Sequence, residues 1–312
     1  MSGDNFLLLY MGNYRNINPY LALGVGLIVL AWGALLIRWA DAPGLVTSFY
    51  RSSIASLVLV IPCLWMLRSD NIALGISNMR LAIWAGVFYG VDVGLHAVGV
   101  NLIGATIPTV LANTAPIWVG LGAMLFFGEK LGLGFWCGLT LAMIGAVMLM
   151  GIDQLHDLAQ SIGSLYGLLA GVFYAAFFLL SQKARNNVDP FSFLCIAFAS
   201  AGCTLGLISI LFRQPIIGYS IQTYMIFVVY GAVVQVGGWL CVSYALGKIS
   251  VSTIAPILLI QAVITGVLAH LFLGEHLNYM QYLGGATVLA GIFVVQRERR
   301  QRMNKVYDQQ RR

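Results

Sequence analysis

Charged side chains are scarce in this chain of 312 residues, because Asp, Glu, Lys and Arg make up only 9% of it. A typical soluble domain is about 25% charged. Hydrophobic residues make up 60%, and the mean hydropathy is +0.87. This composition excludes a disordered chain and a water-facing globular domain. Most of the surface must face lipid, and since roughly 20 apolar residues cross a bilayer, there is room for about ten crossings.

Cysteines are few, and recognisable catalytic motifs are missing. The five cysteines lie in apolar stretches without a CxxC pair, which predicts buried hydrophobic residues rather than metal ligands or disulfides. The sequence contains no Walker loop, no HExxH or GxSxG motif and no Cys/His cluster. We therefore expect no enzyme, no catalytic residue, no metal site and no cofactor, and no ATP hydrolysis by this chain itself.

Ten apolar segments separate along the chain. Helices are the only suitable spanning element, because a barrel would need alternating strands of about ten residues. The predicted fold class is an all-α polytopic membrane protein with ten transmembrane helices. The predicted spans are 19–38, 45–67, 81–101, 105–128, 131–151, 161–182, 190–212, 223–247, 250–274 and 277–296.

Lys and Arg are divided unevenly between the two sides that ten spans define. Fourteen lie on the side of the termini, and only Arg38, Arg51 and Arg213 lie on the other. The positive-inside rule places the richer side in the cytoplasm. We expect a multi-pass protein of the cell inner membrane, with an N-terminal tail (1–18) and a basic tail (297–312) both cytoplasmic. Topology then explains the net charge of +6, and nucleic acid is not an expected partner.

The sequence repeats itself at an offset of 146 residues. Residues 125–131, LFFGEKL, match residues 271–277, LFLGEHL. The same offset relates two pairs of glycines, Gly138 with Gly284 and Gly145 with Gly291. Hydrophobic composition alone does not explain glycines and glutamates that coincide at helix ends.

Each half of the chain, 19–151 and 161–296, holds five of the predicted helices. Because five is odd, the second half enters the membrane from the opposite side, and the two halves form an inverted repeat. Such repeats support alternating access, with a solute site between the halves near the membrane midplane. Duplication can also simply build a scaffold, which is the alternative interpretation.

These features together resemble the drug/metabolite transporter superfamily, within its EamA branch. The residues that carry the resemblance are Gly128-Glu129, Gly274-Glu275, Pro116 and Arg51 with Ala55. The resemblance spans residues 19 to 296. The sequence departs from the family pattern in two places. Pro256 lies six residues before the position equivalent to Pro116, and the seventh predicted helix has no arginine equivalent to Arg51. The resemblance implies transport, often outward, of amino acids, other small metabolites or drugs, without fixing the solute.

Asp92 is the only acidic residue deep inside a predicted span. An ionisable group there costs at least about 2.5–3.5 kcal/mol on insertion scales and is a functional candidate by default. Tyr89 and His96 lie three residues before and four residues after it, so all three share one face of the helix. We interpret Asp92 as a site for a cationic group or a proton, with His96 as its partner. The alternative is a structural pair that joins neighbouring helices.

Other helices carry further candidates for substrate binding. Gln235 and Gly238 are the repeat equivalents of Tyr89 and Asp92, so the two halves place different chemistry at matched positions. Aromatic rings bind amines by cation–π attraction and bind flat solutes by stacking, although most aromatic residues in membranes only pack. The remaining candidates are Trp32, Asn113, Tyr174, Phe178, Trp239 and Gln261.

A second set of residues is predicted to gate the protein or to support its structure. Pro116 and Pro256 each leave a helix carbonyl without its usual donor, which predicts a bend. Glu129 and Glu275 end their helices on opposite sides of the membrane, where the helix dipole disfavours a negative charge. Each glutamate therefore needs compensation and is predicted to form a clasp at its mouth. Arg51 either meets a substrate carboxylate or forms a local salt bridge or snorkels, and the second interpretation is favoured.

The sequence thus predicts a secondary transporter, an exporter or an exchanger, of a small organic metabolite such as an amino acid or an amine. One alternative is transport of a nucleoside-like or cofactor-type metabolite, and another is a membrane scaffold or sensor subunit that transports nothing. The expected partners are the solute and the lipid bilayer, with protons as a candidate coupling ion. A single chain with two fused halves is sufficient as a monomer, and a homodimer stays open.

If Asp92 is functional, the variant Asp92→Asn should fold at normal yield and show altered solute transport or an altered dependence of transport on pH. The measurements are the yield of folded protein and the solute flux across a range of pH. Normal turnover and a normal pH response in well-folded Asp92→Asn protein would contradict this interpretation. A fall in folded yield would indicate the structural pair instead.

Overall fold

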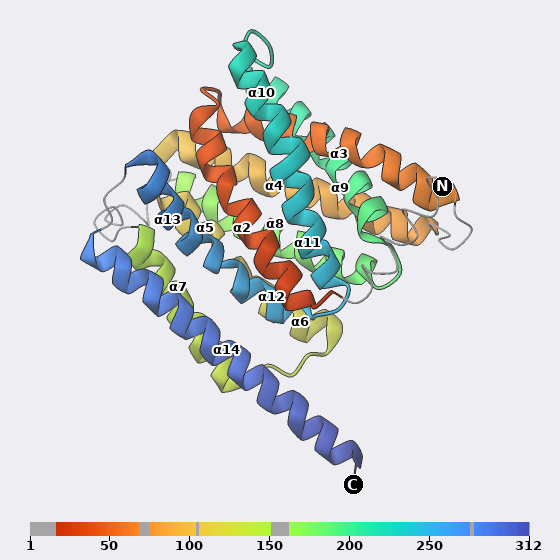
Figure 1. Cartoon of the computed structure of the whole chain (residues 1–312), viewed down its shortest axis with the longest axis vertical. Coiled ribbons are helices and arrows are strands. Elements are labelled where there is room, and N and C mark those ends of the chain that lie inside the picture. Colours follow the sequence, from red (N-terminus) through yellow and green to blue (C-terminus); the bar gives the residue numbers. More distant parts are fainter. Residues whose placement is uncertain (1–16, 69–74, 104–105, 151–161, 275–277, 312) are drawn as a thin grey trace.

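The computed structural model describes residues 17–68, 75–103, 106–150, 162–274 and 278–311, and within them it consists of helices joined by short turns. The helices of the first half are α2 (Pro19–Trp39), α3 (Gly44–Arg68), α4 (Ile76–Ile103), α5 (Thr106–Ala112), α6 (Ala115–Phe127) and α7 (Leu133–Met150). Those of the second half are α8 (Ile162–Arg185), α9 (Pro190–Leu211), α10 (Ile221–Val229), the π-helix η2 (Tyr230–Gln235), α11 (Val236–Leu246), α12 (Val251–Leu258), α13 (Ile260–Leu273) and α14 (Tyr279–Arg311). Figure 1 shows the bundle that they form.

Eight helical segments of the described chain are long and apolar enough to cross a membrane. A ninth apolar segment, Leu133–Leu149 of α7, is shorter. The tenth is the uncharged first half of α14, which begins at Tyr279. The predicted all-α membrane fold with two five-helix repeats is therefore confirmed.

Two predicted spans are broken rather than continuous. The span predicted over 105–128 is divided into α5 and α6, and Pro116 lies in the first turn of α6, where no intrahelical donor is needed. The span predicted over 250–274 is divided into α12 and α13 at Leu259, three residues after Pro256. Each divided segment is still long and apolar enough to span a membrane, and the breaks lie close to the two prolines from which bends were predicted.

The eighth span contains a wider turn that the sequence did not predict. Tyr230–Gln235 form a π-helix between α10 and α11. A π-helix closes its hydrogen bonds from i to i+5, and such segments are frequent at functional sites. The wider turn brings Tyr230 and Gln235, five residues apart, toward the same side of the helix.

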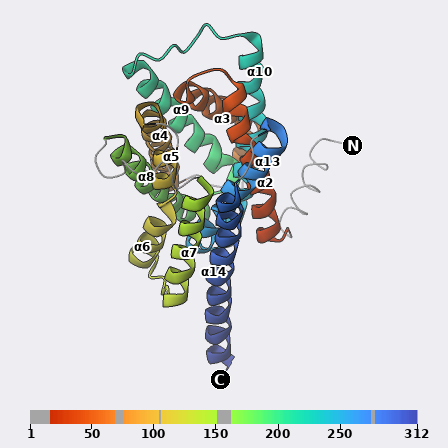
Figure 2. The ribbon, with the colours of Figure 1, turned by 90° about the vertical axis from the view of Figure 1, so that its left-hand side faces the viewer.

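The last helix extends past the predicted apolar span. The basic segment that begins at residue 297 is part of α14, which continues without a break to Arg311. No glycine or proline follows Gly291, and the segment is rich in Arg and Gln, which favour helix. Figures 1 and 2 show this helix leaving the bundle at its C-terminal end.

The repeated Gly-Glu motif has a local explanation. Gly128 ends α6 with φ of 65°, and Gly274 ends α13 with φ of 67°. This left-handed conformation closes a helix but is unfavourable for residues with a Cβ atom. Both halves therefore use glycine at the same position to turn the chain sharply at the end of the fourth helix of each repeat.

Glycine pairs join α7 to α14 across the two halves. A Cβ on Gly138 would lie 2.8 Å from the carbonyl oxygen of Gly291, and one on Gly145 would lie 2.6 Å from that of Gly284. Gly138 thus meets Gly291, the repeat equivalent of Gly145, and Gly145 meets Gly284, the repeat equivalent of Gly138. A pseudo-twofold axis between the halves requires this crossed pairing. Small residues allow such close backbone approach in lipid, and both views show the two helices side by side (Figures 1 and 2).

This packing makes Gly291 intolerant of even one methyl group. In Gly291→Ala the new Cβ would lie 2.6 Å from the carbonyl oxygen of Gly138, and overpacking of this kind costs about 1–3 kcal/mol. We expect a lower thermal unfolding midpoint in detergent. The matched control is Gly24→Ala in α2, where a Cβ would meet nothing within 4 Å. Equal midpoints for the two variants would contradict the account of the α7–α14 contact.

Candidate functional site

The polar centre of the bundle lies where the third helix of one half meets its counterpart in the other. Gln235, at the end of η2, donates a hydrogen bond from Nε2 to the hydroxyl of Tyr89 in α4 at 3.1 Å. These residues are 146 positions apart, the offset of the repeat. Both side chains are buried, with exposed fractions of 0% for Gln235 and 3% for Tyr89. Two repeat-equivalent residues therefore touch each other at the pseudo-twofold axis.

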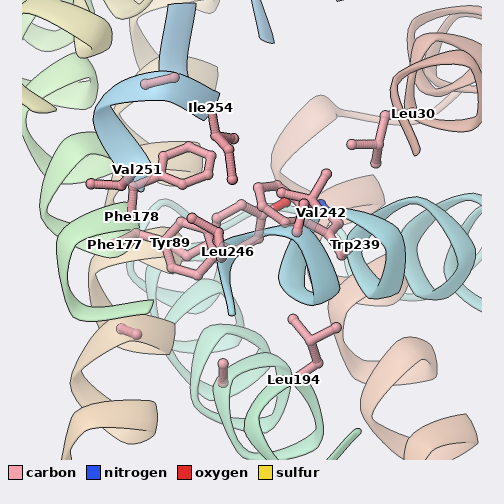
Figure 3. Packing of buried hydrophobic residues seen from close by; sticks show 14 of the residues in the cluster. Leu30, Tyr89, Phe177, Phe178, Leu194, Trp239, Val242, Leu246, Val251 and Ile254 are labelled. Carbon is pink, nitrogen blue, oxygen red and sulfur yellow. The ribbon is translucent and has the colours of Figure 1, made fainter. Parts of the chain in front are cut away.

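An aromatic cluster covers one side of this pair. The ring of Tyr89 lies 5.5 Å from that of Trp239 and 5.0 Å from that of Phe177. Phe178 and Tyr174 lie 5.8 and 6.4 Å from Trp239. Figure 3 shows Tyr89, Phe177, Phe178 and Trp239 converging from α4, α8 and α11. The structure thus brings together four of the predicted aromatic candidates, Tyr89, Tyr174, Phe178 and Trp239.

Arg51 enters the same region from α3. Its Nη1 donates to the hydroxyl of Tyr230 at 2.5 Å, and its Cζ lies 5.0 Å from the centroid of the Tyr230 ring and 5.9 Å from that of Tyr89. Both contacts cross to other helices and point into the bundle. Within the described residues its guanidinium lies among the rings of the site. The favoured interpretation of Arg51 as a local salt bridge or a snorkelling arginine stays a prediction.

Asp92 also lies at this centre, and its exposed fraction is 7%. Its predicted partnership with His96 is not observed. The Nε2 atom of His96 instead forms a hydrogen bond with the hydroxyl of Thr109 in α5 at 3.0 Å. Asp92 interacts electrostatically with the charged group of Arg51. Within the described chain, however, the two groups form no ion pair at 4.0 Å or less.

Three other predicted binding residues contact other parts of the bundle, and one of them, Trp32, also packs beside Tyr230. The ring of Trp32 lies 4.9 Å from that of Phe272 and faces the α13 side of α2. Gln261 donates to the carbonyl of Leu30 at 3.4 Å, which joins α13 to α2. Asn113 lies at the break between α5 and α6. A direct role in binding for these three residues remains a prediction.

A second polar cluster joins the halves at one end of the bundle. Arg299 of α14 forms an ion pair with Glu129 at 2.7 Å and donates to Ser250 at 2.5 Å and to Thr253 at 3.0 Å. Ser252 donates to the same glutamate and accepts from the same arginine. We call these five residues the Glu129 clasp.

The Glu129 clasp supplies the compensation that the glutamate was predicted to need. The ion pair is mostly buried, with side-chain exposed fractions of 17% for Arg299 and 14% for Glu129. Glu129 also faces the N-terminal turn of α12, whose dipole favours a negative charge. Glu275, predicted to form the equivalent contact at the other end, lies outside the described residues.

Sequence reasoning missed three contributors to these clusters. Tyr230 was missed because an ideal α-helix places it on a different face from Gln235, and only the π-turn aligns the two. Phe177 looked like any packing residue next to Phe178. Arg299 was counted only as part of a basic tail, and its spacing after the last apolar residue carries no separate signal.

Within the described residues, no group of three or more His, Cys, Asp or Glu side chains is placed to hold a metal ion. The buried groups instead offer hydrogen-bond donors, acceptors, opposite charges and aromatic faces. This combination suits an organic solute with polar ends and an apolar body.

Comparison with known families decides the class of the protein. A model of the EamA-like transporter family matches the chain twice, at residues 16–151 and at residues 161–297. The chain belongs to the EamA-like transporter family. The two matches correspond to the two halves that the glycine pairs and the Tyr89–Gln235 contact relate to each other.

Relatives of this EamA-like protein are also transporters. An uncharacterised transporter of Archaeoglobus fulgidus is 25% identical over 280 residues, which cover 89% of this chain and 96% of that protein. The pseudopaline exporter CntI of Pseudomonas aeruginosa is 22% identical over 265 residues, or 84% of this chain and 89% of the exporter. A solved crystal structure matches with a TM-score of 0.72 at 16% identity, over 89% of this chain and 96% of that one, which shows the same fold. The chain is therefore a multi-pass membrane transporter.

The Tyr89–Gln235 contact makes a testable contribution to stability. Tyr89→Phe removes the hydroxyl and leaves the buried Gln235 amide without this partner, which costs about 1–3 kcal/mol. We expect a lower thermal midpoint for Tyr89→Phe. Adding Gln235→Leu should cost less in the Tyr89→Phe background than in the wild type, because the two side chains share one interaction. Strictly additive effects would show that the contact does not form.

Proposed function

We propose that this protein is a secondary transporter, an exporter or an exchanger, of a small organic metabolite such as an amino acid or an amine. The observation that carries the proposal is the group of buried polar side chains at the boundary between the halves, namely Arg51, Tyr89, Asp92 and Gln235. Buried ionisable groups inside membrane segments are costly and typically mark solute or ion pathways. Inverted repeats place such sites where the halves meet.

The aromatic cluster shapes the apolar side of the proposed site. Tyr89, Phe178 and Trp239 are almost fully buried, with exposed fractions of 3%, 1% and 4%. Because their rings already pack against one another, they offer little open face for a large stacked base. This packing favours a small metabolite over the nucleoside-like alternative.

The Glu129 clasp provides a gate for alternating access. It ties α6 of the first half to α12 and α14 of the second half at one end of the bundle. In the proposed cycle this clasp closes one mouth, which the distribution of Lys and Arg assigns to the cytoplasm. It must open for the site to face that side, so its stability sets how often the transporter changes state.

Solute flux in proteoliposomes tests the proposed function. The purified protein is reconstituted and supplied with labelled amino acids, amines and nucleoside-like metabolites, with and without a pH gradient. The proposal predicts saturable flux of an amino acid or an amine, and an effect of the gradient would add protons as a coupling ion. Absence of saturable flux from verified folded protein would favour the scaffold or sensor alternative.

Weakening the clasp should favour the open mouth. Arg299→Gln removes the charge that faces Glu129, and coupling energies of about 1–3 kcal/mol correspond to roughly 5- to 150-fold changes in population. We expect hydrogen–deuterium exchange of the first α12 amides, around Ser252, to become at least about fivefold faster. The control is Arg300→Gln, which removes an exposed charge from the next position.

The same acceleration in Arg300→Gln would mean that net charge, and not the clasp, controls this end of the bundle. Unchanged exchange in Arg299→Gln would mean that the ion pair does not hold the mouth closed. Glu129→Gln should reproduce the effect of Arg299→Gln, because it removes the other partner of the same ion pair.

A further inference from the structure

Among the residues that the structure describes, the guanidinium of Arg51 forms no ion pair at 4.0 Å or less. Its hydrogen-bond partner is the neutral hydroxyl of Tyr230, and its other close neighbour is the ring of Tyr89. Its Nε atom is buried and has no hydrogen-bond partner within the described chain. Buried arginines are normally paired with carboxylates or phosphates, so Arg51 retains donor capacity that no described residue uses.

Arg51 as a whole residue is half-buried, although its guanidinium lies between helices. Its exposure is intermediate, whereas Tyr89 and Tyr230 beside it are buried. The contacts to Tyr230 and Tyr89 come from the second and first halves respectively. Arg51 therefore stands at the boundary between the halves, where the proposed solute site lies.

Groups that accept hydrogen bonds lie close to Arg51. Asp92 is buried on α4, one helical turn after Tyr89, whose ring lies 5.9 Å from the Cζ atom of Arg51. The Oε1 atom of Gln235, the hydrogen-bond partner of Tyr89, is buried without a partner within the described chain. The guanidinium donor of Arg51, the carboxylate of Asp92 and the amide oxygen of Gln235 thus lie around the ring of Tyr89. Arginine binds carboxylates through two parallel hydrogen bonds, and carboxylate and amide oxygens accept from ammonium groups.

We propose that Arg51 binds the carboxylate of the transported solute, and that the solute is a zwitterion whose ammonium group faces Asp92. This inference rests on the proposed transport function and narrows it, because a simple amine has nothing to offer Arg51. Bound in this way, the solute neutralises both buried charges. A solute with a single charge leaves one of them uncompensated, and this difference makes the site selective.

The contacts of Arg51 also explain how its guanidinium is oriented before a carboxylate binds. The hydroxyl and the ring face of Tyr230 orient the guanidinium without neutralising it. Tyr230 begins the π-helix whose last residue is Gln235. The same wide turn therefore carries both the residue that orients the donor and an acceptor, so that Arg51 needs little reorganisation when a carboxylate binds.

Competition in proteoliposomes tests the proposed selectivity. Counterflow of labelled protein amino acids first identifies the amino acid that is carried best. Three unlabelled competitors are then compared: that amino acid, its decarboxylated amine and its primary amide. The amine and the amide keep the ammonium group but lack the carboxylate. We expect both to compete at least about tenfold more weakly than the amino acid, by the free energy of one charge-assisted pair.

Variants assign the selectivity to Arg51. In Arg51→Gln the half-saturating concentration of the amino acid should rise at least about tenfold, while inhibition by the amide stays unchanged. Arg51→Lys keeps the charge but not the planar pair of donors, and we expect an intermediate result. The control is Arg213→Gln in the exposed turn after α9, which removes a positive charge from the same side and should leave transport unchanged. If Arg51→Gln does not fold, Arg51→Lys and the wild-type competition series decide.

The outcomes separate this inference from the function on which it rests. If amines or amides are carried or compete as well as the amino acid, the carboxylate role of Arg51 is overturned and the transporter stands. If Arg51→Gln weakens the amino acid and the amide equally, Arg51 supports the structure and not the carboxylate. If folded protein carries no solute of the panel, both proposals are overturned.

Discussion

The contact between the two halves at small residues is the constraint on which the rest of the structure depends. In lipid no hydrophobic force drives helices together, so close packing and interhelical hydrogen bonds must do so. Gly138 and Gly145 provide this packing, each against the repeat equivalent of the other, and Tyr89 and Gln235, which are equivalent to each other, provide the hydrogen bond. Both contacts are therefore consistent with one pseudo-twofold axis between the halves, close to which the polar side chains lie.

The two halves share a backbone plan but differ in chemistry at the centre. The repeat equivalent of Tyr89 is Gln235, that of Asp92 is Gly238, and Arg51 has no equivalent arginine in the second half. One half therefore supplies the charges, and the other supplies the neutral groups that orient them. A symmetric backbone is what alternating access between two mouths requires, and asymmetric side chains are what a site for an asymmetric solute requires.

Composition, spacing and self-similarity were sufficient to predict the membrane fold, the inverted repeat and most of the central residues. They failed where geometry departs from an ideal helix. The π-turn that aligns Tyr230 with Gln235 has no periodic signature in the sequence. The contact between Arg51 and Tyr230 was therefore not predicted. Helical spacing placed His96 near Asp92, but its ring turns toward Thr109 instead. Arg299 reaches Glu129 because α14 stays helical past its apolar first half.

Distances between spin labels at the two mouths test the central claim that the halves alternate around this axis. Labels at the exposed positions Lys130 and Arg300 report on the mouth of the Glu129 clasp, and labels at Leu102 and Leu271 report on the opposite end. The account predicts two populations in the reconstituted protein, in which one distance lengthens as the other shortens, with a transported solute shifting their ratio. A single unchanging pair of distances, with and without solute, would contradict it.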